Sequence, residues 1–303
     1  MAEPKLAAWA WPHRADSGAD KAIFVARGHV LELVSAALAP ANLQALLAKG
    51  VGLAHLYPSP WLRPMADIDL LVRTRDLDAV TAALAAAGFS VERDLERPRT
   101  GSLLEVAVRP PTNAMQLLLE LHVAMDKAVL RPVHIDGVFA RSAAHDALPQ
   151  LRIPTLEDHV LLVALHLAAD EYRHAAGFAD LEVLITAGAD LEIVVARAKQ
   201  ARASAALYVA FATLEHLLPG FVPPETLAAL RPGSAHEALL RTTFDIGAWP
   251  VAKRPTKLGA QWLLGQWLLQ DDATPFAVGL ASYLGKRVLE RMAQAATVLR
   301  RDR

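Results

Sequence analysis

Cysteine is absent from the sequence of 303 residues. Its absence excludes disulfide bonds and zinc sites built from thiolates, and it suits a reducing compartment such as the cytoplasm. An excess of charge of either sign is also missing, because the formal net charge is −1 at pH 7. A dedicated nucleic-acid-binding protein normally carries a strongly basic surface. Nucleic acid is therefore a less expected partner than a small molecule or a protein.

Long apolar runs are missing as well. The longest, HVLLVALHLAA (159–169) and LGAQWLLGQWLL (258–269), fall short of the roughly 20 residues needed to span a bilayer. The N-terminal sequence has neither the cationic lead nor the apolar segment of a signal peptide. Hydrophobic residues make up 53% of the chain and charged residues 21%, as in packed globular proteins. We expect a soluble, cytoplasmic protein with no membrane span.

The first half of the chain alternates between strand and helix patterns. Apolar residues at helical spacing predict a helix over 21–40, and ADIDLLV (66–72) predicts a strand, followed by a helix that stops near Gly88. SLLEVAV (102–108) and MQLLLELHVAM (115–125) predict two more strands, joined by a turn that contains two prolines. This order predicts an α/β or α+β fold with a mixed or antiparallel sheet.

The pattern changes half-way along the chain. Pro154 is followed by Thr155 and Asp158 in the spacing of a helix capping box, and an apolar helical stripe comes next. Beyond it we find helices but no strand alternation. The sequence therefore predicts two domains, 1–150 and 151–303, of which the second is all-helical.

Acidic residues interrupt two of the apolar strands. Asp67 and Asp69 share one face of their strand, because residues i and i+2 project to the same side. Glu120 and His122 share a face of the last predicted strand in the same way. If the strands are neighbours, these carboxylates supply the oxygen ligands that Mg²⁺ or Mn²⁺ requires. The alternative is that the acids line the polar face of a half-exposed sheet.

Lys49, Gly50 and Arg63 are candidates for binding phosphate. Gly50 lets the backbone approach a ligand closely, and free N–H groups at the start of a following helix attract an anion. Arg63 could hold a phosphate through two parallel hydrogen bonds. The alternatives are an ordinary loop with a solvated Lys49, and a surface arginine.

Polar residues recur along the helix predicted after Asp158. His166, Asp170 and His174 are four residues apart and stack on one helix face, with Arg173 nearby. This face is interpreted either as turned toward a cleft or as a hydrogen-bond network between the domains. A zinc site is the weaker alternative, because one helix offers only two well-placed ligands.

The segments LLAKG (46–50), RPMADIDLLVRTRDLDAVTAALAAAGF (63–89) and LELHVAM (119–125) together resemble a known family. It is the bacterial nucleotidyltransferase family of the DNA polymerase beta superfamily, in a mostly uncharacterised branch with LKG, R-x-x-x-D-I-D-L-L-V and E-L-H motifs. The resemblance covers roughly residues 22–185. It implies an α+β fold, in which a small mixed sheet flanked by helices (1–150, with an N-terminal helix) precedes an all-helical C-terminal domain.

The resemblance also implies a metal, a cosubstrate and site residues. The cofactor would be Mg²⁺ or Mn²⁺ and the cosubstrate an NTP. Asp67 and Asp69 match the metal-binding pair, Glu120 the third carboxylate, and Gly50 the glycine of the phosphate-side turn, beside Lys49. A histidine-rich helix that ends in an aspartate is another family feature. The candidates for the cleft or acceptor side are His122, His166, Asp170, Arg173, His174 and Asp180.

The turn departs from the usual Gly-Gly or Gly-Ser of the superfamily. It is Gly50-Val51-Gly52 here, with no serine, and a long insert (51–66) separates it from Asp67. A serine contact to phosphate would have to be replaced by another group.

The resulting hypothesis is an Mg²⁺-dependent nucleotidyltransferase that moves a nucleoside monophosphate from an NTP to an unknown small-molecule or protein acceptor. An inactive relative that acts as a binding, antitoxin-like or adaptor protein is the alternative, and a γ-phosphate transferase is a third. For the first hypothesis, Asp69→Asn is expected to abolish activity and leave the fold intact, because it relieves repulsion between carboxylates.

Overall fold

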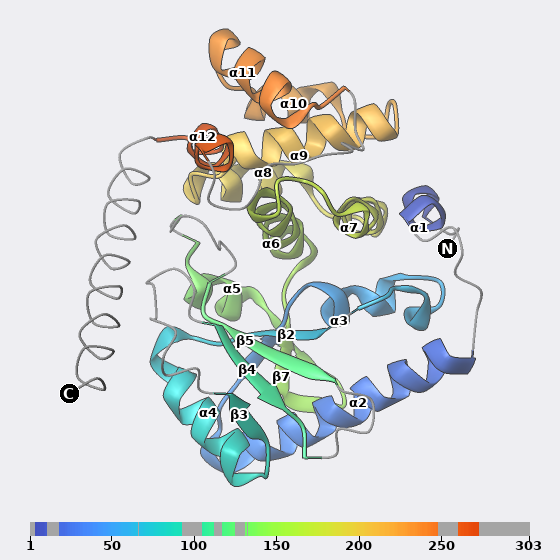
Figure 1. Ribbon diagram of the computed structural model, residues 1–303, viewed down its shortest axis with the longest axis vertical. Helices are drawn as coiled ribbons and strands as arrows, with labels where there is room; N and C mark the ends of the chain where they lie inside the picture. The colour runs from blue at the N-terminus through green and yellow to red at the C-terminus, as the bar shows by residue number, and fades with distance from the viewer. Residues whose placement is uncertain are drawn as a thin grey trace, which may run out of the picture.

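The structure is a computed structural model, and it describes residues 4–10, 18–65, 67–92, 105–111, 117–124, 131, 133–247 and 260–272. These residues form a mixed sheet flanked by helices, followed by a helical region (Figure 1). The α+β fold is therefore confirmed.

The sheet contains parallel and antiparallel pairs. Its strands are β1 (Ala45–Leu47), β2 (Asp67–Leu71), β3 (Ser90–Glu92), β4 (Glu105–Arg109), β5 (Leu118–His122), β6 (Ala143–His145) and β7 (Leu148–Ile153), in the spatial order β3-β4-β5-β2-β1-β7-β6. The pairs β2–β5 and β1–β7 are parallel, and the other neighbours are antiparallel. The predicted hairpin of β4 and β5 is present. β1, β3, β6 and β7 are additional strands that the sequence pattern did not indicate.

Two helices cover one face of the sheet. They are α2 (Gly18–Leu38) and α4 (Leu77–Ala86), which share a hydrophobic core with the strands. Ile68 and Leu70 of β2 and Leu119 and Leu121 of β5 are fully buried in this core. The alternate positions of β2 and β5, which include the acids, therefore point to the opposite face. Gly88 ends α4 with a φ of 88°, as its predicted role as a helix stop requires.

Helix α2 has the composition of a membrane-spanning helix. The stretch Gly18–Ala41, with a mean hydropathy of 1.5, is long and apolar enough to cross a membrane. The apolar runs of the sequence predict no such span. Val30, Val34 and Leu38 of this helix pack into the core beneath the sheet. A core helix passes the same test, so the composition is weak evidence for a span.

Short helices lie on the acidic side of the sheet, ahead of the helical region. They are α3 (Lys49–Leu53) and α5 (Ile135–Arg141). Four 3₁₀ turns occur elsewhere along this part of the chain, at Ala39–Ala41 after α2, at Ala54–Leu56 and Pro60–Leu62 after α3, and at Thr74–Asp76 before α4. The helical region contains α6 (Leu156–Ala169), α7 (Ala175–Thr186), α8 (Leu191–Gln200), α9 (Ser204–Leu217), α10 (Pro224–Leu230), α11 (Ser234–Phe244) and α12 (Ala260–Leu268). Its core is separate from the core beneath the sheet and is built around α6, α7 and α9.

The start of α6 follows the predicted cap. The Thr155 side chain accepts a hydrogen bond from the Asp158 backbone N–H at 3.3 Å. β7 ends at Ile153, so the sheet and the helical region are joined by a very short connection. The division into domains at residue 150 stays a prediction.

The end of α6 differs from the predicted helix. The helix stops at Ala169, because Glu171 and Tyr172 adopt left-handed φ values of 53° and 57°. Tyr172 turns inward, is fully buried, and donates a hydrogen bond to the Ala206 carbonyl at 2.7 Å. Asp170 and His174 therefore lie in the connection between α6 and α7, not on one continuous helix.

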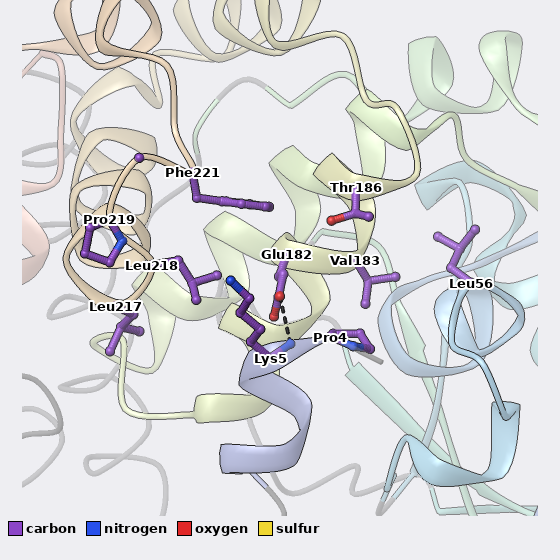
Figure 2. A pocket seen from close by; sticks show the side chains of 11 residues that line it. Pro4, Lys5, Leu56, Glu182, Val183, Thr186, Leu217, Leu218, Pro219 and Phe221 are labelled. Atoms are coloured by element: carbon purple, nitrogen blue, oxygen red, sulfur yellow. Dashed lines mark hydrogen bonds between the residues drawn. The ribbon is translucent and has the colours of Figure 1, made fainter. Parts of the chain in front are cut away.

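The N-terminal helix α1 (Lys5–Ala10) packs on α7 through a buried acid. Glu182 accepts hydrogen bonds from the backbone N–H groups of Lys5 and Leu6, each at 2.8 Å. Beside this contact, α1, α7 and the connection after α9 enclose a mainly apolar cavity of about 600 Å³ (Figure 2). None of the acids of β2 and β5 lines it.

Candidate active site

The strands that carry the acids run side by side in the centre of the sheet. β2 and β5 are parallel neighbours, and their register places Asp69 opposite Glu120 and Leu71 opposite His122. Paired residues of adjacent strands project to the same side of a sheet. Asp69 and Glu120 therefore share a face, as the alternation of the two strands predicts.

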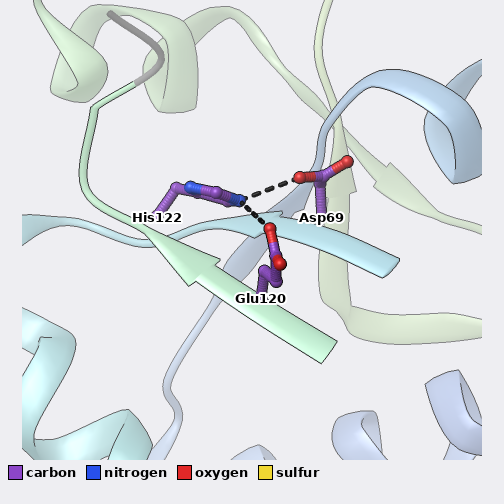
Figure 3. Close-up of side chains that lie close together, drawn as sticks. All are labelled: Asp69, Glu120 and His122. Atoms are coloured by element: carbon purple, nitrogen blue, oxygen red, sulfur yellow. Dashed lines mark hydrogen bonds and ion pairs between the residues drawn. The ribbon is translucent and has the colours of Figure 1, made fainter. Parts of the chain in front are cut away.

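Two side chains, those of His122 and Lys49, lie against the same carboxylate oxygen of Asp69. Figure 3 shows His122 between Asp69 and Glu120. His122 Nε2 lies 2.8 Å from Asp69 Oδ1 and 3.4 Å from Glu120 Oε2. Lys49 Nζ also lies 2.8 Å from Asp69 Oδ1, and the two side chains are only 9% and 8% exposed. We call Lys49, Asp67, Asp69, Glu120 and His122 the carboxylate cluster.

The pKa values of three groups in the cluster are shifted by burial and by their charged neighbours. Burial alone would raise the pKa of Asp69, but the hydrogen bond from His122 and the charge of Lys49 outweigh it and hold that pKa well below its usual range. Burial, and then the charges of Asp69 and Glu120, raise the pKa of Asp67. Burial lowers the pKa of His122, yet its carboxylate partners produce a net rise that favours the imidazolium.

The pairing of Asp69 changes what we expect of Asp69→Asn. Lys49 and His122 both pair with Asp69, so their attraction opposes the repulsion from the other carboxylates. Because the replacement leaves a buried ammonium without its counter-charge, we expect it to destabilise the fold. Repulsion also acts on Asp67, whose pKa is raised.

The donors of the cluster fit a divalent cation. One ligand atom from each of Asp69, Glu120 and His122 lies within 4.8 Å of the other two. Carboxylate oxygens suit Mg²⁺ and Mn²⁺, and the imidazole nitrogen adds a ligand that transition metals accept. Asp67 is not part of this group of ligand atoms, and its part in metal binding stays a prediction.

The turn after β1 brings Lys49 to Asp69. The Ala48 backbone N–H donates to the Asp69 carbonyl at 3.2 Å, so the two chain segments lie against each other. Lys49 then adopts a left-handed φ of 47°, which is unusual for a residue with a side chain. Lys49, predicted to bind phosphate, contacts a carboxylate in this structure.

The glycines of the turn are required by close packing. A Cβ atom on Gly50 would lie 2.5 Å from Arg63 Nη1, whereas one on Gly52 would lie 2.3 Å from the Leu47 carbonyl oxygen and 2.9 Å from His159 Nε2. A Cβ atom on Gly50 would also lie 2.7 Å from the Met65 side chain. These side chains can yield only at a cost to the ion pair of Arg63 with Asp180, whereas the Leu47 carbonyl belongs to the backbone and cannot yield. Gly52, to which the sequence assigned no role, is the stricter requirement.

Arg63 connects the turn to the helical region. Its Nε and Nη2 donate to the two carboxylate oxygens of Asp180 on α7, at 3.1 and 2.6 Å, and Tyr57 Oη donates to Asp180 Oδ1 at 2.7 Å. The Arg63 and Asp180 side chains are 11% and 2% exposed. Burial opposes the charge of Arg63, but Asp180 produces a net rise in its pKa. We call Tyr57, Arg63 and Asp180 the α7 junction. The predicted role of Arg63 in binding phosphate stays a prediction.

The predicted polar residues of the α6–α7 connection form a group of their own. His166 Nε2 and His174 Nε2 lie 3.5 and 3.7 Å from the same oxygen of Asp170, and Arg173 pairs with Glu171. The three predicted neighbours His166, Asp170 and His174 therefore do lie together, although α6 ends at Ala169. Their assignment to the acceptor side stays a prediction.

His159 is a structural residue that the sequence did not single out. It is buried on α6, and its Nε2 lies 3.2 Å from the Leu47 carbonyl oxygen at the end of β1. Burial lowers the pKa of His159 to about 4, so the neutral ring donates to that carbonyl. His159 directly follows Asp158 in the sequence, and nothing in this local pattern indicates a contact with β1.

Comparisons with known proteins identify a family. The model of a family described as uncharacterised nucleotidyltransferase matches residues 25–219. The match includes the carboxylate cluster and the α7 junction. No curated protein and no solved structure matches the chain. The chain belongs to this uncharacterised nucleotidyltransferase family.

Proposed function

We propose that the chain is a metal-dependent nucleotidyltransferase of the DNA polymerase beta type. An oxygen of the acceptor attacks the α-phosphorus of an NTP, the bond from that phosphorus to the β-phosphate bridging oxygen breaks, and pyrophosphate leaves. The observation that supports the proposal best is the register of β2 and β5, which sets Asp69 beside Glu120 on one buried face. Carboxylates in such an arrangement hold the cations used in phosphoryl transfer.

The residues of the cluster then have separate roles. Asp67, Asp69 and Glu120 would hold Mg²⁺ or Mn²⁺, with His122 as a neighbouring ligand or donor. The cation, when bound, would neutralise charge that develops on the phosphates. Glu120 would also accept the proton of the acceptor hydroxyl. Lys49 and the turn around Gly50 would meet the triphosphate.

The helical region would supply the acceptor side of the site. The α7 junction ties α7 to the turn through buried hydrogen bonds, so an acceptor bound near α7 would stand at a fixed distance from the cluster. The acceptor is a small molecule or a protein, in keeping with the net charge of −1.

One observation favours the second candidate, a nucleotide-binding protein without catalysis. Asp69 already carries the cationic partners Lys49 and His122 on a single oxygen, and the usual serine of the turn is absent. A protein of this kind would bind NTP and release no pyrophosphate.

The test uses the full chain with each NTP, labelled in turn at the α- and γ-phosphate, in Mg²⁺ or Mn²⁺. Water, small hydroxyl compounds and proteins of a cell extract serve as acceptors. We expect the α-label to appear on an acceptor together with free pyrophosphate. Transfer of the γ-label instead would indicate a phosphotransferase, and bound but unchanged NTP would favour the binding protein.

Matched variants connect this activity to the cluster. Asp67→Asn and Glu120→Gln should lower turnover by at least about 100-fold, on the scale of removing an electrostatic contact to the reacting group. Asp78→Asn makes the same change on the exposed side of α4 and should leave turnover unchanged. Equal activity in Glu120→Gln and Asp78→Asn would contradict the assignment.

A further inference from the structure

Lys49 already supplies a positive charge at the point where a metal ion would bind. Its ammonium lies 2.8 Å from Asp69 Oδ1, the same oxygen that faces His122 Nε2. The lysine and the aspartate are both buried, so this ion pair is weakly screened by solvent. A divalent cation that binds Asp69 through Oδ1 must share this oxygen with the ammonium or displace it, and one that binds through Oδ2 is still repelled by the nearby ammonium.

The backbone at Lys49 favours a specialised role for this side chain. Lys49 has a left-handed φ of 47°, a conformation that residues with a Cβ rarely adopt, at the first residue of α3. The charge of Lys49 also reaches Asp67 and His122, where it opposes the net rise in the pKa of each. The ammonium therefore acts on Asp67 and His122 as well as on its partner Asp69.

A phosphate group offers Lys49 an alternative partner. A lysine side chain is a point charge on a flexible four-carbon stem, so it can move between nearby anions without a change in the backbone. The nucleotide arrives with negative phosphate oxygens and, at the same time, with a cation that competes for Asp69. Each of these favours the same movement of the ammonium, from the carboxylate toward the phosphate.

We propose that Lys49 is a built-in competitor for Asp69, which a metal ion displaces only when nucleotide phosphate is present to accept the lysine. The inference rests on the proposed function and adds an order of binding to it. Metal alone binds weakly, nucleotide alone binds weakly, and each raises the affinity for the other by the same factor. The site is therefore kept from holding a metal ion before a nucleotide arrives.

The experiment measures Mn²⁺ binding by electron paramagnetic resonance of the free ion. The full chain is titrated alone and with α,β-methylene analogues of the four NTPs, which are not cleaved at the reacting bond. We expect the analogue to raise the Mn²⁺ affinity of the wild type at least about tenfold, a coupling of ordinary size. Lys49→Met keeps the length of the side chain and removes its charge. It should bind Mn²⁺ alone about tenfold more tightly than the wild type and show little further gain with the analogue.

Two variants serve as controls. Lys199→Met makes the same change on the exposed face of α8 and should behave as the wild type. Lys49→Arg retains the charge and should retain the coupling. If Lys49→Met binds Mn²⁺ alone no more tightly than the wild type while Asp69→Asn abolishes binding, the competitor role is wrong and the metal site stands. If no variant binds Mn²⁺ with any analogue, the proposed function fails and this inference fails with it.

A measurement on the wild type covers the case in which Lys49→Met does not fold. A buried, paired ammonium gives an observable nitrogen–proton signal in nitrogen-15 lysine NMR, assigned by its loss in Lys49→Arg. The signal should be unchanged by Mg²⁺ alone and should shift when Mg²⁺ and the analogue are added together. An equal shift with Mg²⁺ alone would overturn the proposal.

Discussion

The carboxylate cluster and the α7 junction are both buried groups of charged side chains, but they are balanced differently. In the junction, both oxygens of Asp180 accept from Arg63, and Tyr57 adds a third hydrogen bond. In the cluster, acids from β2 and β5 are crowded on one face, and the cationic partners converge on a single oxygen of Asp69.

This difference separates a structural ion pair from a binding site. A carboxylate whose lone pairs are satisfied by fixed donors has nothing to offer a ligand, and it stabilises the fold only through its own partners. Where carboxylates repel one another, as Asp69 and Glu120 repel Asp67, a bound cation reduces that repulsion and stabilises the charged form. Removing charges should therefore have large, one-directional effects on stability in the junction and small, opposing effects in the cluster.

The largest effect on stability is expected in the junction. Asp180→Ala leaves the guanidinium of Arg63 buried without its partner, so it should lower the free energy of unfolding by about 3–5 kcal/mol. Asp136→Ala is the matched control, because the Asp136 side chain is 63% exposed and pairs with Arg75 and Arg73 at the surface. The control should cost about 0–1 kcal/mol. Urea unfolding compares the two, and similar losses would remove the distinction between the regions.

The turn between the two regions should be sensitive at Gly52 more than at Gly50. Gly52→Ala places a Cβ against the Leu47 carbonyl, and we expect a loss of about 1–3 kcal/mol, the usual range for overpacking. Gly50→Ala meets the side chains of Arg63 and Met65, which yield more easily than backbone atoms, so its loss of stability should be smaller. Thermal unfolding of the two variants ranks their losses of stability. A larger loss in Gly50→Ala than in Gly52→Ala would show that the side chains around Gly50 tolerate an added methyl group less well than the Leu47 carbonyl does.

The contact of His159 with β1 predicts a dependence of stability on pH. The folded pKa, about 4, lies below the ordinary value of 6.5, so the neutral ring favours folding. This contribution is complete above pH 6.5 and is lost as the pH falls through 6.5 toward 4. Between pH 7.5 and 5 the wild type should lose about 2 kcal/mol more than His159→Gln does. Parallel urea titrations at the two values test this, and equal losses would mean that the folded ring titrates normally.

Effects smaller than in the junction, and opposite in sign to each other, are expected within the cluster. Asp69→Asn should destabilise the metal-free chain by about 1–3 kcal/mol, because it leaves Lys49 buried without a counter-charge. Asp67→Asn should stabilise the chain by less than about 1 kcal/mol after allowance for solvent screening, because it removes a repelled charge. The pH dependence follows the same signs. Stability from Asp69 is lost as the pH falls below the ordinary aspartate range, and stability from protonated Asp67 is lost as the pH rises through its raised pKa. A shift of the same sign in both variants would contradict the account.

Much of the cluster could be predicted from local patterns. The period of two in a strand fixes which residues share a face, so Asp67, Asp69, Glu120 and His122 could be assigned to faces before their strands were known to pair. The alternating leucines of β5 also set the register, because a slip by one residue would bury Glu120 in the core. The capping box at Thr155 marked the start of α6 for a similarly local reason.

Contacts between distant segments could not be predicted in this way. The pair of Arg63 and Asp180 joins residues 117 positions apart, and no short pattern indicates it. The end of α6 depends on the burial of Tyr172, which is a tertiary contact. No local pattern indicates that Lys49 pairs with Asp69 on β2. Its place in a glycine-containing turn predicted a contact with phosphate instead. β7 was missed because LPQLRI carries Pro149, which has no backbone N–H to donate and argues against a strand.

The most direct test of the account is the shift in melting temperature caused by metal and nucleotide together. The full chain is heated alone, with Mg²⁺, with an α,β-methylene NTP analogue in EDTA, and with both, for the wild type, Asp67→Asn and Asp78→Asn. At about 100-fold excess over the dissociation constant, binding should stabilise the folded chain by about 2.7 kcal/mol, or several degrees. We predict this rise for the wild type and Asp78→Asn only when metal and analogue are both present, and its loss in Asp67→Asn. No rise in the wild type, or an equal rise in Asp67→Asn, would contradict the claim that the carboxylate cluster binds the metal–nucleotide complex.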